Sequence, residues 1–231
     1  MKKLLTMLTS LTLMGLAGVA PAQAAIVAGW NSFNAATASY PKAADTVGAN
    51  ITSTGLDTAG IDRRVQSFVL GSTVSTSPGR WNGNSTVNTG QYVEFAVQPS
   101  AGFQVDFTDL QLNARQDETQ LDLVLRSSVD GFTNNLGTQV SLTNSFNTYS
   151  FDLSSLAPQT GPVQFRLYGL NASGLNVLFI ANNSANVAGG GFVALNGDIT
   201  PTPTVSTPEP SGIVSLIAVG ALGAASLRRR G

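Results

Sequence analysis

The chain has 231 residues, of which only 11% are charged, and it contains neither histidine nor cysteine. Zinc sites built on His or Cys ligands, Ser-His-Asp triads and thiol nucleophiles are therefore excluded. Residues 25–207 contain seven Lys and Arg against twelve Asp and Glu. This net negative charge disfavours a nucleic-acid partner, because phosphate backbones bind basic surfaces.

The first 24 residues have the pattern of a secretory signal peptide. Two lysines form a positive start, an apolar stretch runs over residues 4–20, and Ala22 and Ala24 supply an Ala-x-Ala cleavage site. We expect a signal helix over residues 1–24, Sec-type export and cleavage after Ala24. A buried N-terminal helix is the alternative, but no capping or amphipathic pattern accompanies the run. An exported chain without cysteine is not held by disulfides, so its stability must come from a packed core.

Residues 25–200 are predicted to form one all-β domain. Apolar and polar side chains alternate over residues 92–97 and 103–107, and this period of two places one face of a strand in a core. After Phe107 the apolar positions change from odd to even numbers, so Thr108-Asp109 is predicted to be a bulge or corner that divides two strands. Further apolar or alternating runs lie at residues 65–70, 121–125, 139–142, 149–153, 163–167, 177–180 and 192–195.

Turn-forming sequences separate these runs. They lie at residues 127–132, which contain Asp130-Gly131, and at residues 158–162 and 171–174. Many short strands at this spacing predict an antiparallel β-sandwich of the jelly-roll type.

Carboxylates are the main groups left for acid-base chemistry. A glycosidase places two of them across the bond that it cleaves, but the clustered acids of this chain fit solvated strand edges and turns. Calcium is the metal that oxygen ligands alone would hold, yet no loop has the regular acidic spacing of a dedicated site. We therefore predict no catalytic residue, metal or cofactor. The acids considered are Asp106, Asp109, Asp117, Glu118 and Asp122 for catalysis, and Asp117-Glu118 and Asp130-Gly131 for calcium.

Sugar binding requires exposed aromatic rings that stack on pyranose faces. Trp30, Trp81 and Tyr168 are the candidates, and Trp81, within residues 78–84, is expected to be the most exposed. A core position is the alternative for each ring, since aromatic residues of sandwiches are commonly buried. Three strand arginines, Arg115, Arg126 and Arg166, are expected to pair across the sheet with carboxylates such as Asp122.

The end of the chain has the pattern of a linker and a membrane anchor. Proline at alternate positions keeps residues 201–210 extended. The apolar run Gly212–Leu227 would span about 24 Å as a helix, against about 30 Å of hydrocarbon. The arginines that follow, Arg228, Arg229 and Arg230, would snorkel and stay cytoplasmic. Residues 211–231 are thus predicted to form a short transmembrane helix in the inner membrane; a helix packed on the domain is the alternative.

Pro208-Glu209-Pro210, the apolar run and the terminal arginines together resemble the PEP-CTERM sorting signal. The resemblance implies recognition by an exosortase-like enzyme, cleavage near residues 208–210 and release of the domain outside the cell, as with other removable C-terminal anchors. Residues 125–132, 146–153 and 161–169 are similar to segments that recur in PEP-CTERM ectodomains. This second resemblance covers about residues 91–199 and implies a β-sandwich related in shape to carbohydrate-binding modules.

These patterns together predict a non-enzymatic exported protein. We expect it to be anchored transiently in the inner membrane and then placed at the cell surface or in the extracellular matrix, among exopolysaccharides. Two alternatives stay open. One is a lectin, similar to a carbohydrate-binding module, that binds exopolysaccharide, and the other is a polysaccharide-active enzyme that uses a carboxylate pair.

Overall fold

The computed structural model describes residues 25–31, 41–61, 63–64, 69–70, 81, 85–116, 120–172, 178–180 and 193–203. The chain divides into two compact units, Met1–Thr200 and Pro201–Gly231, and nearly all described residues belong to the first. Within the described ranges the regular structure is β-strand, apart from one 3-10 turn, η1 (Ser128–Asp130). The all-β prediction is therefore confirmed. No helix within these ranges has the length and apolar character needed to cross a membrane; the predicted helices over residues 1–24 and 211–231 lie outside them.

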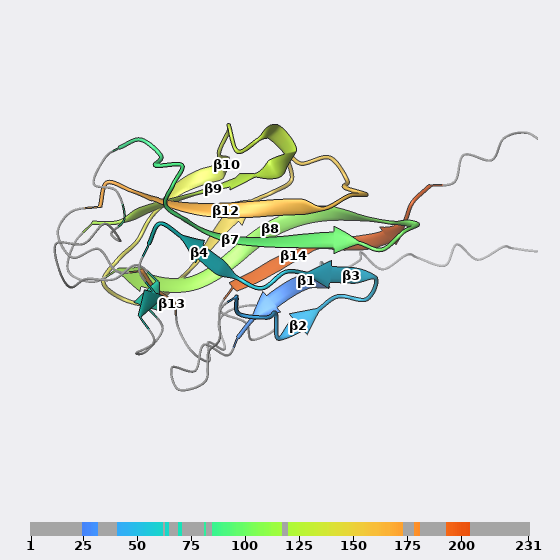
Figure 1. The fold of residues 1–231 in the computed structure, drawn as a ribbon, viewed down its shortest axis with the longest axis horizontal. Helices are drawn as coiled ribbons and strands as arrows, with labels where there is room; N and C mark the ends of the chain where they lie inside the picture. Colours follow the sequence, from blue (N-terminus) through green and yellow to red (C-terminus); the bar gives the residue numbers. More distant parts are fainter. Residues whose placement is uncertain are drawn as a thin grey trace, which may run out of the picture. The chain divides into compact units, whose positions relative to one another are not determined.

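An eight-stranded sheet forms one layer of the first unit, in the order β2-β1-β14-β8-β13-β6-β5, with β11 also paired to β8 (Figure 1). The pairings given for its described residues are antiparallel. Its strands are β1 (Ala25–Trp30), β2 (Thr46–Val47), β5 (Arg63–Arg64), β6 (Val69–Leu70), β8 (Phe103–Gln116), β11 (Asn147–Asp152), β13 (Leu178–Ile180) and β14 (Val193–Pro201).

A six-stranded sheet forms the other layer, in the order β10-β9-β12-β7-β3, with β4 also paired to β7. These pairings too are antiparallel. Its strands are β3 (Ile51–Ser53), β4 (Asp57–Ala59), β7 (Tyr92–Pro99), β9 (Asp122–Ser127), β10 (Leu136–Ser141) and β12 (Val163–Leu170).

The two sheets are joined by aromatic side chains. Trp30 of β1 lies 4.8 Å from Phe95 of β7, and Phe107 of β8 lies 5.3 Å from Phe165 of β12, measured between ring centroids. Phe95 and Phe165 stack on each other at 5.4 Å. The first two of these contacts link one sheet to the other, so the core lies between the sheets and the unit is a β-sandwich.

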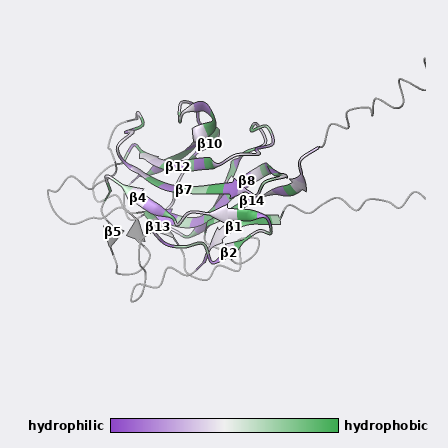
Figure 2. Cartoon of the chain, turned by 45° about the vertical axis from the view of Figure 1, so that its right-hand side comes forward, coloured by the Kyte–Doolittle hydropathy of each residue, from purple (hydrophilic) through white to green (hydrophobic). Residues whose placement is uncertain are grey.

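The period-two pattern predicted for residues 92–97 is confirmed in β7. Val93, Phe95 and Val97 are at most 3% exposed, whereas Tyr92, Glu94 and Ala96 are half-buried. Hydrophobic and hydrophilic residues accordingly follow one another along the strands in Figure 2. One face of β7 therefore packs in the core and the other face is available for function.

The prediction that residues 108–109 divide two strands is wrong, because β8 continues through them as a single strand. The buried positions do change from odd to even numbers, since Phe107 is buried before residues 108–109 and Leu110 is buried after them. Leu153 donates its backbone N–H to the carbonyl of Thr108 at 2.9 Å, and β11 pairs with β8 from Asp109 onward. This pairing keeps the backbone extended while the buried face changes.

The remaining predicted runs correspond to β9 to β14, with shifts of a few residues at their ends. The run at residues 65–70 is described only at its end, as β6, and residues 65–68 lie outside the described ranges. Residues 46–59 form three short strands, β2, β3 and β4, that the alternation pattern did not predict. Strands of two or three residues are too short to show a period.

Candidate functional site

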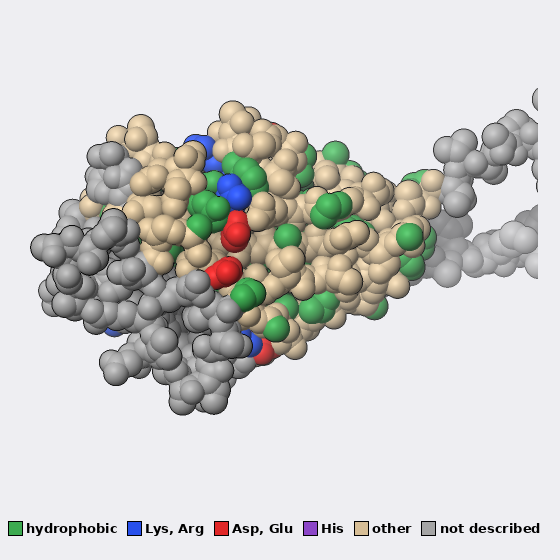
Figure 3. Space-filling view, in the orientation of Figure 1, with side chains coloured by type: hydrophobic (Ala, Val, Ile, Leu, Met, Phe, Trp, Pro, Cys, Tyr) green, Lys and Arg blue, Asp and Glu red, His purple; other side chains and the backbone are tan. Residues whose placement is uncertain are grey.

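The outer face of the six-stranded sheet carries a row of four charged residues. Asp57 of β4 is the register partner of Glu94 of β7, Glu94 is the partner of Arg166 of β12, and Arg166 is the partner of Arg126 of β9. Successive side chains of a strand point to opposite faces, and Phe95 points into the core, so this row points away from it. Figure 3 shows acidic and basic side chains close together on this side of the molecule.

Arg166 is held in place by an acid and by two aromatic rings. Its Nε lies 3.2 Å from Oε2 of Glu94, and its Cζ lies 4.1 Å from the centre of the Tyr92 ring and 4.0 Å from that of Phe132. Burial lowers the pKa of Arg166, but a hydrogen bond with Tyr168 and the electrostatic effects of Tyr92, Tyr168 and Glu94 raise it above its usual value. The guanidinium is therefore a fixed cation, and its contact with each ring adds stabilisation.

Amide side chains extend this network along the face. Oε2 of Glu94 also accepts a hydrogen bond from Nε2 of Gln164 at 2.7 Å. Arg126 donates from Nε to Oδ1 of Asn135 at 2.8 Å and from Nη1 to the carbonyl of Phe132 at 3.0 Å. Glu94, Arg126 and Arg166 each have polar partners, so these hydrogen bonds fix their side chains on this face.

The loop between β9 and β10 holds Phe132 over Arg166. Phe132 has a φ of 61°, and this left-handed conformation is uncommon for a bulky residue. Oδ1 and Oδ2 of Asp130 accept hydrogen bonds from the backbone N–H groups of Thr133, at 3.2 Å, and Asn134, at 2.8 Å. Asp130 thus caps the turn that was predicted at residues 127–132. Strained residues of this kind occur preferentially at binding sites, which draws attention to Phe132.

Acid is expected to weaken this loop through Asp130. Burial raises the pKa of Asp130, but the hydrogen bonds from Asn134 and Thr133 outweigh it and leave the pKa below its ordinary value. Folding therefore favours the carboxylate, so the stabilisation is complete above about pH 4, the unfolded pKa, and is lost as the pH falls through the lower folded value. We expect the free energy of unfolding, measured by urea titration, to fall less between pH 7 and pH 3 in Asp130→Asn than in the parent chain. Asp106→Asn, at an exposed position of β8, controls for the loss of one charge; an equal change in both variants would contradict this role.

A groove follows β7 beside the charged row. It lies where the segment that forms β3 and β4 is interrupted in its pairing with β7. β3 and β4 both pair with β7, and Thr54 still donates its backbone N–H to the carbonyl of Ala96 at 2.8 Å, but residues 55–56 leave the ladder. Ala96 donates its N–H to Oγ1 of Thr54 at 2.7 Å, so a side-chain hydroxyl replaces a backbone acceptor. Leu56 instead exchanges two backbone hydrogen bonds of 2.8 Å with Lys42. The chain therefore moves away from β7 after Thr54 and leaves open space beside the side chain of Ala96.

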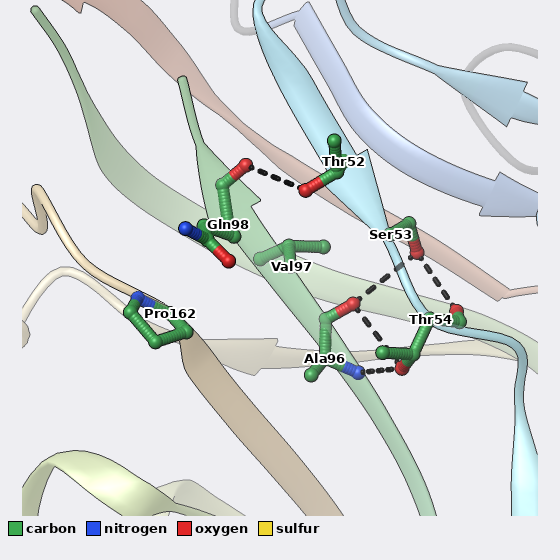
Figure 4. A pocket seen from close by; sticks show the side chains of 7 residues that line it. All are labelled: Thr52, Ser53, Thr54, Ala96, Val97, Gln98 and Pro162. Carbon is green, nitrogen blue, oxygen red and sulfur yellow. Dashed lines mark hydrogen bonds between the residues drawn. The ribbon is translucent and has the colours of Figure 1, made fainter. Parts of the chain in front are cut away.

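Two adjoining hollows make up this space, which we name the β7 groove. They share Thr54 and Ala96 and have volumes of about 290 and 230 Å³. In the first, shown in Figure 4, the hydroxyls of Thr52, Ser53 and Thr54 lie on one side of β7 and Pro162 on the other. The lining also includes Gln98 in the first hollow and Pro41, Gly55, Asp57, Glu94 and Gln164 in the second.

The three aromatic residues proposed for sugar binding are buried. Trp30, Trp81 and Tyr168 are 0%, 2% and 1% exposed, so the expectation that Trp81 is the most exposed ring is wrong. The indole of Trp81 lies against Gly169, where a Cβ would collide with it, and near Leu121. Because position 169 is glycine, the core has room for this ring. The partly exposed rings of Tyr92 and Phe132 are better placed, and the sequence marked them only by an alternating position and by an Asp-Gly turn.

The clustered acids do not converge in the described part of the chain. Asp106 and Asp109 belong to β8 of one sheet, whereas Asp122 belongs to β9 of the other, and Asp117 and Glu118 lie outside the described residues. Within the described ranges no three acidic side chains are grouped as metal ligands would be. Asp57 and Glu94, which sequence reasoning missed, do line one hollow.

The cross-strand pairing expected for the arginines is found at Arg166, but with Glu94 as its acid. Asp122 is 2% exposed and accepts side-chain amide hydrogen bonds instead, from Asn171 at 2.6 Å and Gln139 at 3.0 Å. The prediction that Asp122 pairs with an arginine is therefore wrong. The amide donors satisfy Oδ2 of Asp122 without burying a second charged group.

Comparisons with known proteins identify no family. No protein-family model matches the chain, and no curated protein matches it. Among solved structures, the enzymatically active domain of bacteriophage CBA120 tailspike protein 4 is similar with a TM-score of 0.26 and 15% sequence identity. The similarity covers 65% of this chain and 20% of the tailspike chain, so this chain spans about a fifth of that protein's length.

The sorting and cleavage residues predicted at the two ends lie outside the described residues. These are Ala22 and Ala24 at the start of the chain, and Pro208, Glu209, Pro210, Arg228, Arg229 and Arg230 at its end.

Proposed function

We propose that this chain is a non-enzymatic exported protein that serves at the cell surface or in the extracellular matrix. The observation that carries the proposal is the order of features at the C-terminus, where a Pro-Glu-Pro motif, an apolar run and three arginines follow one another. In this proposal residues 1–24 form a signal helix that directs Sec-type export. Residues 211–231 then form a helix that anchors the chain in the inner membrane until an exosortase-like enzyme removes it.

Two features of the described domain support a function outside the cell. Its core joins two sheets through aromatic contacts, so a chain without cysteine keeps its fold where no disulfide supports it. Its polar residues are mainly Asn, Gln, Ser and Thr, and only 11% of the chain is charged. We assign the sandwich to the jelly-roll type.

Replacing Pro208, Glu209 and Pro210 together by alanine is expected to block removal of the anchor. The parent chain should then be found at the surface or in the medium without residues 211–231, whereas the variant should stay in the membrane fraction at full length. Cell fractionation and mass spectrometry of the mature C-terminus measure both. Pro201→Ala/Pro203→Ala, in the same linker, is the control and should be processed as the parent chain is. If the parent protein from the cell surface still carries residues 211–231, the sorting proposal is rejected.

Carbohydrate binding is the second candidate function. It is favoured by the β7 groove, which is lined by hydroxyls and amides and lies beside partly exposed aromatic rings. Enzymatic cleavage of a glycan would require Asp57 and Glu94 to act as the carboxylate pair. Glu94 is already bound by Arg166 and Gln164, an arrangement that suits a positioning role and favours binding over cleavage.

A further inference from the structure

The β7 groove offers hydrogen-bonding groups that suit the hydroxyls of a sugar. Thr52 and Gln98 are exposed, and Gln164 is half-buried with its amide at Glu94. Hydroxyls and carboxamides both donate and accept hydrogen bonds, as sugar hydroxyls do. The methyl group of Ala96 and the ring of Pro162 provide apolar surface between them. A mainly apolar surface with a few placed polar groups is typical of small-molecule sites.

The charges around the groove give an acidic ligand no net attraction, since Asp57 and Glu94 are balanced by Arg166 and Arg126 in the charged row. The second hollow is lined by two carboxylates, Asp57 and Glu94, and by no basic residue. Arg166, the nearest cation in register, is already paired with Glu94. A uronate chain in the groove would bring further negative charge next to these acids, and like charges repel most strongly where water is partly excluded.

The groove, together with the outward face of β7 that continues it to Tyr92, has the length to hold several sugar units. The outward residues of β7 recur at every second position, from Gln98 through Ala96 and Glu94 to Tyr92. At about 3.3 Å per residue these positions span roughly 20 Å. A chain lying along β7 would therefore pass from the Gln98 hollow to the Tyr92 and Phe132 rings that enclose Arg166.

We propose that the β7 groove binds a single chain of an uncharged polysaccharide, laid along β7. The side chains that contact it are those of Thr52, Gln98 and Gln164, with Pro162 and Ala96 as the apolar surface. This inference rests on the carbohydrate-binding function proposed above and adds the site and the chemical class of the ligand.

Isothermal titration calorimetry of the purified full-length chain tests the proposal. The neutral probes are mannohexaose and cellohexaose, and the acidic probe is a hexamer of galacturonic acid. We expect at least one neutral hexamer to bind more tightly than the acidic one. Thr52→Ala/Gln98→Ala is expected to weaken that binding about tenfold, as the loss of two hydrogen bonds predicts. Gln164→Ala, in the second hollow, should weaken it independently.

Thr138→Ala/Ser141→Ala is the control, since it replaces two exposed polar residues of β10, at the other edge of the sheet. It should bind as the parent chain does. Neutral binding that both groove variants leave unchanged would overturn the site but not carbohydrate binding. Tighter binding of the acidic hexamer would overturn the ligand class. If no hexamer binds, the site and the carbohydrate-binding function are both rejected, while the sorting proposal is tested separately by cell fractionation.

Discussion

Phe165→Ala is expected to lower the free energy of unfolding by about 3–5 kcal/mol, the usual cost of removing a fully buried phenylalanine. Phe165 is 0% exposed and contacts aromatic rings from both layers, Phe95 beside it and Phe107 across the core. The substitution would leave a cavity at the point where the sheets are joined, and both ring contacts would be lost. Urea titration followed by tryptophan fluorescence measures the change, because Trp30 packs against Phe95 in the same core.

Phe146→Ala is the control for this prediction. Phe146 is 47% exposed, and its contact with Arg115 is a cation-π interaction at 5.4 Å. Its removal should cost less than about 1 kcal/mol. If the two variants were destabilised equally, Phe165 would not lie in the core that joins the sheets. Since the chain has no disulfide, a large loss at Phe165 would also show that this packing is a main source of stability.

Alternation along the sequence predicted the strands whose two faces differ most. β7 and the first half of β12 show it clearly, because each has a core face built from Val and Phe, with Leu in β12, and an outer face that carries polar residues. The same alternation placed Glu94 and Arg166 on the outer face. It did not show that they are neighbours, since the order of strands in a sheet depends on contacts between segments far apart in the chain.

Other features of the candidate site have no period in the sequence. The β7 groove exists because residues 55–56 leave the ladder, and the hydroxyl of Thr54 takes the place of a backbone acceptor. The burial of Trp81 depends on the missing side chain of Gly169, which lies 88 positions later in the chain. The placement of Phe132 depends on a left-handed backbone that the Asp130 cap supports. Each of these depends on particular residues and not on a repeated pattern, so a search for periodicity does not find it.

Asp109→Ala is expected to destabilise the eight-stranded sheet by about 2–3 kcal/mol. Asp109 joins three strands, because Oδ1 accepts a hydrogen bond from Asn196 of β14 at 2.8 Å, while Oδ2 accepts from Gln111 of β8 at 2.7 Å and from Ser150 of β11 at 3.1 Å. Hydrogen bonds to a charged acceptor are among the stronger ones. Asn196 is 4% exposed, so its amide would be left buried without an acceptor, and this accounts for much of the cost.

Asp106→Ala tests whether this effect belongs to the position or to the loss of any acid from β8. Asp106 lies three residues earlier on the same strand and is exposed, so its replacement should change the free energy of unfolding by at most about 0.5 kcal/mol. Urea titrations of both variants at pH 7 give the comparison. Equal and small effects would show that the hydrogen bonds of Asp109 contribute little. A large loss confined to Asp109 would identify this acid, once considered for catalysis, as the group that holds β8, β11 and β14 in register at the point where the buried face of β8 changes.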